Sequence, residues 1–276
     1  MNNSFLKLFY YKHISDTGFG NFGDELSPLM IERLYGVKTK YAPSSFCNFV
    51  SIGSILDLFS LSQKKGYLRL LNAFRPVSVW GTGFMYANTT PPLNMKYHAV
   101  RGKHTMQKLG LNETNVALGD PGLLASKLLD KTPTTKKYSI GFIPHFVDAD
   151  NDYIIQNASN FPHSTIINVC AAPLDVINQI AQCDFVVSSS LHGLIIADSL
   201  NIPNQWLQLS KNVRGDNFKF ADYYSVFNIK DAKPIDLAQK LIDKKDISTI
   251  SQNYKRDNIS QIQDALFDSF PKNLIT

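Results

Sequence analysis

The chain has 276 residues, of which 44% are hydrophobic, 12% aromatic and 18% charged, a composition typical of globular proteins and not of disordered ones. Its length suits one large domain or two domains of ordinary size, and its net charge of +5 comes from dispersed residues, with no recognisable nucleic-acid-binding motif. Cys47, Cys170 and Cys183 are too few and too widely spaced for a disulfide framework or a zinc site, so we expect them to pack in the core.

Neither a signal peptide nor a membrane span is predicted. Lys7 interrupts the apolar patch near the N-terminus, and no apolar stretch reaches the ~20 residues that cross a bilayer. The densest basic segment, KKGYLRLLNAFR from Lys64 to Arg75, is typical of a solvated helix face, although it could also contact an anionic membrane or substrate. We therefore expect a cytoplasmic protein, with a peripheral contact at the inner face of the membrane as an open alternative.

Short apolar runs alternate with loops rich in glycine, serine or aspartate and with helical patterns. In chain order the runs are LKLFYY, PVSVW, YHAV, VALG, YSIGFI, STIINV, DFVVSS and QWLQL. This alternation predicts parallel strands joined by crossover helices, and hence an α/β fold. Because ligands bind beyond the carboxyl ends of such strands, we expect the functional side chains just after each run.

The first loop, SDTGFGNFGDELSPLM, carries three glycines that let the backbone approach another group closely before a helix begins near Leu26. It lacks the spacing of a Walker motif or of a clean dinucleotide-binding motif. Asn21 and Asp24 are its chemical groups. Asp24 is either part of a site or the cap of the helix, and the sequence leaves both interpretations open.

Three later segments in the first half also follow apolar runs. Gly81 and Gly83 in WGTGF either line a ligand crevice or make a turn. Arg101 comes between a strand and a helix, where its planar guanidinium would bind a carboxylate or phosphate, or merely pair with a neighbouring acid. Asp120 in LGDPGLL is interpreted as a helix cap.

A polar stretch, LDKTPTTKK, is typical of a linker, so we predict two α/β domains, residues 1–130 and 131–276. In the second, His145 follows a strand, and DADND from Asp148 to Asp152 is interpreted as a cap for a helix near Tyr153 and not as a metal site. The patterns DLAQKLIDKK and YKRDNISQIQDALFDSF predict two final helices. The last of them could pack back on the first domain.

The segment SSSLHGLIIADSL combines a turn with a buried helix. After the strand CDFVV, the turn Ser188–Ser190 leads into a helix with His192 in its first turn. The positive end of a helix disfavours imidazolium and its free N–H groups can bind an anion, so a neutral His192 could accept a proton there. Gly193 keeps the approach open. A buried histidine with a purely structural role is the competing interpretation.

Six segments occur together in the order found in polysaccharide pyruvyl transferases, which the chain resembles over most of its length. They are NFGDELSPLM, AVRGKHT, LGDPGLL, IPHF, PLDVINQIAQCDFVVSSSLHGLIIADSLNIP and FKFADYY. The resemblance implies two Rossmann-like domains facing each other across a cleft, as in GT-B glycosyltransferases, with residues 1–130 as the acceptor side. It implies phosphoenolpyruvate as donor, a sugar or lipid-linked oligosaccharide of a bacterial capsule, lipopolysaccharide or exopolysaccharide as acceptor, and a pyruvate ketal as product.

By the same resemblance, His192 corresponds to the catalytic histidine, accompanied by Asp24, and Arg101 to the donor-binding arginine. Many relatives have arginine directly before Leu-His, where this chain has Ser190, so an anion contact must come from elsewhere. The candidates are Lys211, Arg214 and Lys219, and Lys219 in FKFADYY matches a variant of the family. The other residues expected to bind substrate are Asn21, Gly81, Gly83, His145, Ser188, Ser189, Ser190, Leu191, Gly193 and Arg214.

We expect no metal, no other cofactor and no nucleic-acid partner. A nucleotide-sugar glycosyltransferase of GT-B type is the alternative enzyme, although the acidic ribose contact usual for that class is not evident in the sequence.

Overall fold

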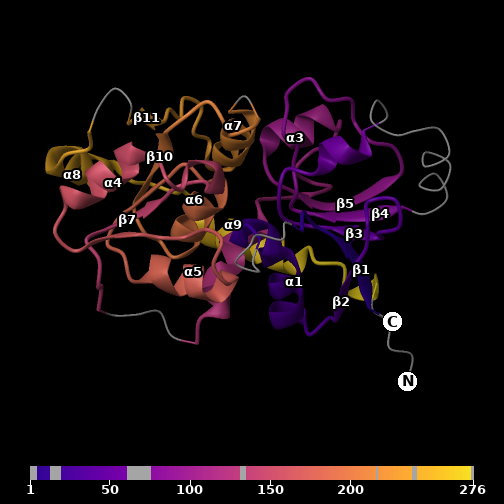
Figure 1. Cartoon of the computed structure of the whole chain (residues 1–276). Helices are drawn as coiled ribbons and strands as arrows, with labels where there is room; N and C mark the ends of the chain where they lie inside the picture. The colour runs from indigo at the N-terminus through magenta and orange to yellow at the C-terminus, as the bar shows by residue number, and fades with distance from the viewer. Residues whose placement is uncertain are drawn as a thin grey trace.

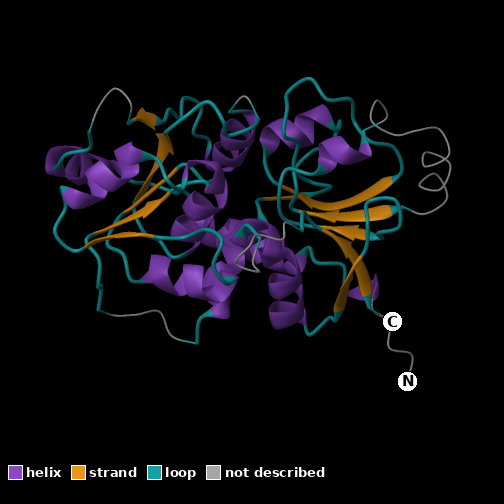
Figure 2. Cartoon of the chain, viewed as in Figure 1, coloured by secondary structure: helices purple, strands orange, loops and turns teal. Residues whose placement is uncertain are grey.

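A computed structural model of the chain describes residues 5–12, 20–60, 76–130, 135–215, 217–237 and 241–274. The strands form two sheets, and helices pack against both of them (Figure 1, Figure 2). Every pair of neighbouring strands is parallel. The chain is therefore an α/β protein built on parallel sheets, as the alternation of apolar runs and helical patterns predicts.

The first sheet has six strands in the order β2-β1-β3-β4-β5-β6. They are β1 (Leu6–Phe9), β2 (Thr39–Tyr41), β3 (Phe49–Val50), β4 (Val77–Trp80), β5 (Met95–Val100) and β6 (Ala117–Leu118). The order reverses at β1, which has β2 on one side and all later strands on the other. Such a reversal leaves a crevice beyond the carboxyl ends of β1 and β3, where open α/β sheets bind ligands.

The second sheet has five strands in the order β11-β10-β9-β7-β8. They are β7 (Ile140–Ile143), β8 (Ser164–Ile166), β9 (Val186–Ser188), β10 (Asn204–Gln208) and β11 (Ile235–Asp236). The order reverses at β7 in the same way, so a second crevice opens beyond β7 and β9. Each of the eight predicted runs overlaps one of the strands. The runs do not include β2, β3 and β11.

Helices connect most of the strands. The α-helices described are α1 (Phe22–Tyr35), α3 (Lys103–Lys108), α4 (Asp152–Ser159), α5 (Pro173–Ala181), α6 (Leu191–Ser199), α7 (Phe218–Tyr224), α8 (Lys244–Asn253) and α9 (Ile259–Asp268). The 3-10 helices are η1 (Leu56–Phe59), η2 (Pro121–Leu128), η3 (Phe146–Asp148), η4 (Ser225–Phe227) and η5 (Lys272–Leu274).

The structure corrects two of the helix predictions. Helix α1 begins at Phe22 and not near Leu26, because the Asn21 side chain caps it by accepting a hydrogen bond from the Gly23 amide. The pattern DLAQKLIDKK does not form one helix: its first residue lies in β11, and α8 begins only at Lys244. A capping box between Asp243 and Asp246 fixes the start of α8, and local capping therefore overrides the apolar spacing.

One hydrophobic core runs between the two sheets. It joins Leu8 of β1 and Met30 of α1 to Ile143 of β7 and Leu194 of α6. Helices α1, α5 and α6 and the 3-10 helix η2 pack against one another in this region. The sheets are consequently held by a shared apolar interior, which fixes the positions of the residues at their carboxyl ends.

The last helix packs back on the first sheet. Helix α9 contacts β6 and η2, and Trp80 of β4 donates hydrogen bonds from Nε1 to the Leu266 carbonyl and to Ser269 Oγ, both at 3.1 Å. Just beyond α9, the ring of Phe270 stacks on Tyr35 of α1 with 3.9 Å between centroids. Figure 1 shows α9, in yellow, in the central region of the molecule beside α1.

Several other expectations bear on the fold. Cys47 and Cys183 are buried as predicted, whereas Cys170 is only half-buried at the edge of the core. Among the described residues, none of the helices has the length and apolarity needed to cross a bilayer. The basic segment from Lys64 to Arg75 lies outside the described residues, as do residues 131–134 of the predicted linker, and the division into two domains stays a prediction.

Candidate functional site

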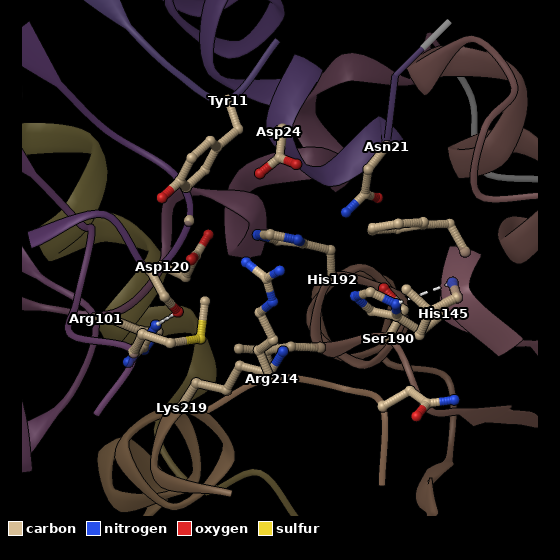
Figure 3. A pocket seen from close by; sticks show the side chains of 17 residues that line it. Tyr11, Asn21, Asp24, Arg101, Asp120, His145, Ser190, His192, Arg214 and Lys219 are labelled. Atoms are coloured by element: carbon tan, nitrogen blue, oxygen red, sulfur yellow. Dashed lines mark hydrogen bonds between the residues drawn. The ribbon is translucent and has the colours of Figure 1, made fainter. Parts of the chain in front are cut away.

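A cavity of about 420 Å³ lies where the crevices of the two sheets meet. Tyr11 follows β1 and Gly53 follows β3, while His145 follows β7 and His192 follows β9. The cavity is therefore lined from the strand-order reversals of both sheets, the position that the topology favours for a ligand. Figure 3 shows the charged and polar side chains that point into it.

The cavity brings together most of the residues that the sequence singles out. Those on its wall are Asn21, Asp24, Arg101, His145, Ser190, Leu191, His192, Arg214 and Lys219. Those that are not on its wall are Gly81, Gly83, Ser188, Ser189, Gly193 and Lys211. The glycines and serines of the second group shape the neighbouring backbone, as described below. Lys211 and Ser189 line a separate cavity of about 250 Å³.

The turn before α6 sets the position of His192. Ser188 Oγ donates to the Ile143 carbonyl at 2.9 Å and accepts from the Ser190 amide at 3.0 Å, which ties the turn to β7. A Cβ at Gly193 would lie 2.4 Å from Ser188 Oγ, so glycine is required for α6 to pack this closely on β9. All nine residues of α6 are buried, and the helix has no freedom to rotate.

His192 is buried, with 8% of its surface exposed, and Nε2 has no hydrogen-bond partner in the described parts of the chain. Burial, followed by the positive charges of Lys219 and Arg101, lowers the pKa of the imidazole to about 3. The ring is neutral at pH 7, and burial is a larger cause than the helix terminus considered from the sequence. A neutral ring with a free nitrogen on a cavity wall can accept a proton.

Gly23, in the first turn of α1, makes room for this ring. A Cβ added there would lie 2.0 Å from His192 Nδ1, which is inside any allowed contact. The sequence predicts that the glycine-rich loop lets the backbone approach another group closely, and at Gly23 that group is the His192 ring. Residues 13–19 of that loop lie outside the described residues.

Gly23→Ala will displace the imidazole without breaking α1, because alanine favours a helix by about 1 kcal/mol over glycine. We expect a histidine titration followed by NMR to show the pKa of His192 rising from about 3 toward 6.5 as the ring moves toward solvent. Arg33→Ala, at an exposed position in the last turn of the same helix, is the matched control. An unchanged titration in a folded Gly23→Ala variant would contradict this packing.

Arg101 is completely buried, and its expected pairing with a neighbouring acid is confirmed. Its Nε donates to Asp222 Oδ2 at 2.9 Å and its Nη2 donates to the Phe84 carbonyl at 2.6 Å, while Nη1 donates to Ser54 Oγ at 2.5 Å. Asp222 also accepts from the amide and hydroxyl of Thr105. The guanidinium is thus paired with an acid and held rigidly on the cavity wall.

Gly81 and Gly83 lie behind this wall. A Cβ at Gly83 would be 2.6 Å from the Arg101 guanidinium carbon, and Gly81, with φ of 90°, packs against Pro121. Both glycines therefore make room for the wall, which explains why they do not contact the cavity themselves.

Asp24 and Lys219 both line the cavity, and the charge of each shifts the pKa of the other. Asp24 is half-buried in the first turn of α1 and is not its cap, since Asn21 has that role. Burial and the neighbouring Glu25 raise the pKa of Asp24 to about 7, with Lys219 opposing the shift. Burial and Arg101 lower the pKa of Lys219 to about 8. At neutral pH the Asp24 carboxyl can both hold and release a proton, and Lys219 is mostly charged.

His145 and Arg214 also line the cavity. The His145 amide donates to Ser189 Oγ at 2.9 Å, and its ring caps η3. Burial and Lys219 lower the pKa of His145 to about 4, so this ring is also neutral at pH 7. Arg214 lines the cavity, and Figure 3 shows its guanidinium pointing toward the His192 ring.

Sequence reasoning missed several residues of the wall. They are Tyr11, Gly53, Ser54, Met85, Asp120, Phe146, Val147 and Asn212. Tyr11 ends the run LKLFYY and follows β1, so the rule that places functional residues after each run could have found it. Gly53 follows β3, which is too short to give an apolar signal. Asp120 is the cap that the sequence predicts, accepting from the Gly122 amide at 2.9 Å, and it also lines the cavity.

Comparison with known proteins supplies a family context. The sequence model of the family described as polysaccharide pyruvyl transferase matches residues 4–207. The chain is 29% identical over 216 residues to an uncharacterised protein, L143, of Acanthamoeba polyphaga mimivirus, which covers 76% of this chain and 72% of that protein. Arg214, Lys219 and Asp222 lie beyond the residues matched by the family.

A second relative is the succinoglycan biosynthesis protein ExoV of Rhizobium meliloti (strain 1021), which is 26% identical over 215 residues. That match covers 76% of this chain but 62% of ExoV, less than two thirds of its length. Among solved structures, a functionally uncharacterised protein from Klebsiella pneumoniae aligns with a TM-score of 0.40 and 16% identity, covering 83% of this chain and 92% of that one.

Proposed function

The chain belongs to the polysaccharide pyruvyl transferase family, and from this premise we propose that it transfers the pyruvyl group of phosphoenolpyruvate to a sugar of a bacterial surface polysaccharide. The product is a pyruvate ketal, and phosphate is released. The observation that carries the proposal is the unpartnered Nε2 of His192 in the same cavity as the cationic side chains of Lys219 and Arg214.

The proposal also covers the arrangement of the two domains and the place of the reaction in the cell. Residues 1–130 and 131–276 form two Rossmann-like domains placed as in GT-B glycosyltransferases, the first on the acceptor side. The reaction takes place in the cytoplasm, and a lipid-linked acceptor would bring the enzyme to the inner face of the membrane.

Phosphoenolpyruvate presents a carboxylate and a phosphate to the cavity. Lys219 and Arg214 supply positive charge, and charge-assisted hydrogen bonds of this kind are the strong ones in proteins. Arg101 uses four of its five N–H groups on Asp222, Phe84 and Ser54, counting both contacts to Asp222, so one Nη1 hydrogen remains for the donor. Because its charge is already paired with Asp222, the Arg101 guanidinium orients the donor anion more than it neutralises the charge of that anion.

The chemistry moves protons without net gain or loss. A proton added to the methylene carbon of phosphoenolpyruvate makes C2 electrophilic, two sugar hydroxyls form bonds to C2, and the bond from C2 to the phosphate oxygen breaks. The two hydroxyl protons are balanced by one proton on the methyl group and one on the phosphate. Asp24 supplies the proton to the methylene carbon, and neutral His192 takes the proton of the first hydroxyl and passes it to the leaving phosphate.

The test of this function uses the purified chain with phosphoenolpyruvate and a panel of nitrophenyl hexopyranosides that have free 4- and 6-hydroxyl groups. We expect binding of phosphoenolpyruvate by calorimetry, release of phosphate, and a ketal methyl group in the NMR spectrum of the product. Absence of phosphoenolpyruvate binding, with binding of UDP- or GDP-sugars in its place, would contradict the proposal and favour a nucleotide-sugar glycosyltransferase.

Lys219→Gln will weaken phosphoenolpyruvate binding by roughly 10–100-fold, the effect of losing one charged hydrogen bond. Because the pKa of Lys219 is about 8, we also expect the affinity of the native chain to fall as the pH rises through 8 and the ammonium loses its proton. Calorimetric titrations between pH 6.5 and 9.5 measure both effects. Lys211→Gln is the matched control, since Lys211 lines the separate cavity, and equal losses in the two variants would argue against a direct contact.

A further inference from the structure

Asp120 has one carboxylate oxygen that its role as a cap does not explain. Oδ1 accepts the Gly122 amide at the start of η2, at 2.9 Å. Oδ2 has no partner among the described residues, although the side chain is completely buried. An unsatisfied buried carboxylate oxygen is costly to a folded protein, whereas a hydroxyl group arriving in the cavity would satisfy it.

The surroundings hold this carboxyl in a fixed position on the cavity wall. Gly119, with φ of 131°, turns the chain sharply after β6, and a Cβ at Gly122 would meet Ile195 of α6 at 2.9 Å. Asp120 is therefore clamped against the helix that carries His192. Figure 3 shows the Asp120 carboxyl pointing toward the same space as His192 and Asp24.

The distribution of charge assigns this part of the wall to the acceptor and not to the donor. Asp24 and Asp120 both come from the first half of the chain, while Lys219 and Arg214 come from the second. A carboxylate repels the carboxylate and phosphate of the donor but accepts hydrogen bonds from the neutral hydroxyls of a sugar. Of the cations, Arg101 acts on Asp120, but its charge is already paired with Asp222.

We propose that Asp120 is a catalytic residue of the acceptor side: its Oδ2 binds the second of the two sugar hydroxyls and takes its proton. This proposal rests on the proposed function. As the second bond from a hydroxyl oxygen to C2 forms, the O–H bond breaks and the proton moves to Asp120. Asp24, which gave a proton to the methylene carbon, recovers one through solvent, so the cycle closes without any further reactant.

The proposal predicts a pH dependence of the activity. Burial raises the pKa of Asp120 to about 7, Asp222 adds to the shift, and the Gly122 amide and Arg101 oppose it. The other titratable groups on the wall near it are Asp24 on α1 and His192 on α6. The pKa of His192 is too low to govern activity near neutrality. The pKa of Asp24 is also about 7, but Asp24 acts as an acid in its protonated form, so its protonation does not lower the activity. We therefore expect a loss of activity between about pH 7 and 5 to report protonation of Asp120.

The test is Asp120→Asn, which keeps an oxygen for the Gly122 amide but cannot take a proton. We expect an unchanged melting temperature, phosphoenolpyruvate affinity within about threefold of the native chain, and kcat lower by about 10²–10⁴-fold. The fall in activity on the acid side, present in the native chain, should disappear. Asp148→Asn is the matched control, because Asp148 is also buried with an unpartnered Oδ2 but does not line the cavity.

Three outcomes would overturn the proposal. Native turnover by Asp120→Asn would show that the residue is only a cap, while leaving the proposed function in place. A loss of phosphoenolpyruvate binding equal to the loss of kcat would move Asp120 to the donor side. Failure of the native chain itself to bind phosphoenolpyruvate would overturn this proposal together with the proposed function.

Discussion

Replacing His192 with alanine will leave the chain folded and will lower the rate of pyruvyl transfer by about 10²–10⁴-fold, the usual contribution of an acid–base side chain. The ring stands on a fully buried helix and lines the cavity, and its Nε2 has no hydrogen-bond partner among the described residues, so its removal takes away a proton acceptor without disturbing the strands around it. Phosphate release and ketal formation at saturating phosphoenolpyruvate measure the rate. Circular dichroism and the melting temperature report the fold.

His98→Ala is the matched control for this variant. His98 is half-buried, its pKa is likewise lowered, to about 4, and it contacts Ser78 at 3.3 Å, but it is not on the cavity wall. We expect the control to retain transfer within a few fold. If His192→Ala unfolds while His98→Ala does not, the histidine has a structural role and the catalytic assignment is wrong.

The same substitution will change the response of the fold to acid. The pKa of His192 is about 3 in the folded chain and 6.5 in the unfolded one, so unfolding takes up a proton between these values. The contribution to stability is complete above pH 6.5 and is lost as the pH falls toward 3. Urea unfolding at pH 7 and 4.5 should therefore show a smaller acid-induced loss for His192→Ala than for the native chain. His145 and His98 add to the loss that remains, and the raised pKa values of Asp24 and Asp120 oppose it.

Removing the partner of Arg101 is the largest stability change that we expect. Asp222→Ala leaves a completely buried guanidinium without its counter-charge and also removes two hydrogen bonds to Thr105. Breaking such a pair costs about 3–5 kcal/mol, a large part of the usual 5–15 kcal/mol of a folded domain. The midpoint of urea unfolding measures the loss, and phosphoenolpyruvate binding should weaken as Arg101 leaves its position.

Two further variants separate stability from binding. Asp198→Asn disturbs a second buried ion pair of the described residues, with Arg256, which lies off the cavity wall, and should lower stability without changing phosphoenolpyruvate affinity. The double variant Arg101→Met with Asp222→Leu should regain stability, because apolar groups often replace a buried pair without loss, yet should not regain binding. A fully stable Asp222→Ala protein would contradict the structural role of the pair.

The periodicity of the sequence predicts the architecture because strands and crossover helices leave local signals. Runs such as PVSVW and YSIGFI contain β4 and β7, whereas β2 at the edge of the first sheet, TKY, has no apolar alternation to reveal it. The predicted helix at DLAQKLIDKK fails because apolar spacing cannot show that the chain enters the second sheet at Ile235–Asp236.

The candidate site, like the fold, is predictable from the sequence only in part. Positions after strands, such as His145, are readable from the order of elements, and the resemblance of the motifs adds Lys219. The contacts between distant segments are not readable: Arg101 and Asp222 are 121 residues apart, and no local pattern connects Gly23 with His192. Asp120 shows a further limit: the sequence predicts that it caps a helix, but it cannot show that its second carboxylate oxygen has no partner in a residue that lines the cavity.

The packing of α9 against Trp80 imposes an order on biosynthesis. The Leu266 carbonyl that Trp80 bonds is 186 residues further along the chain, so at translation rates of 5–20 residues per second the ribosome delivers it roughly 10–40 s after the tryptophan. During that interval the indole lacks its contacts with Leu266 and Phe270. We therefore expect the nascent first half to bind chaperones. A message truncated before α9 would yield a chain prone to aggregate.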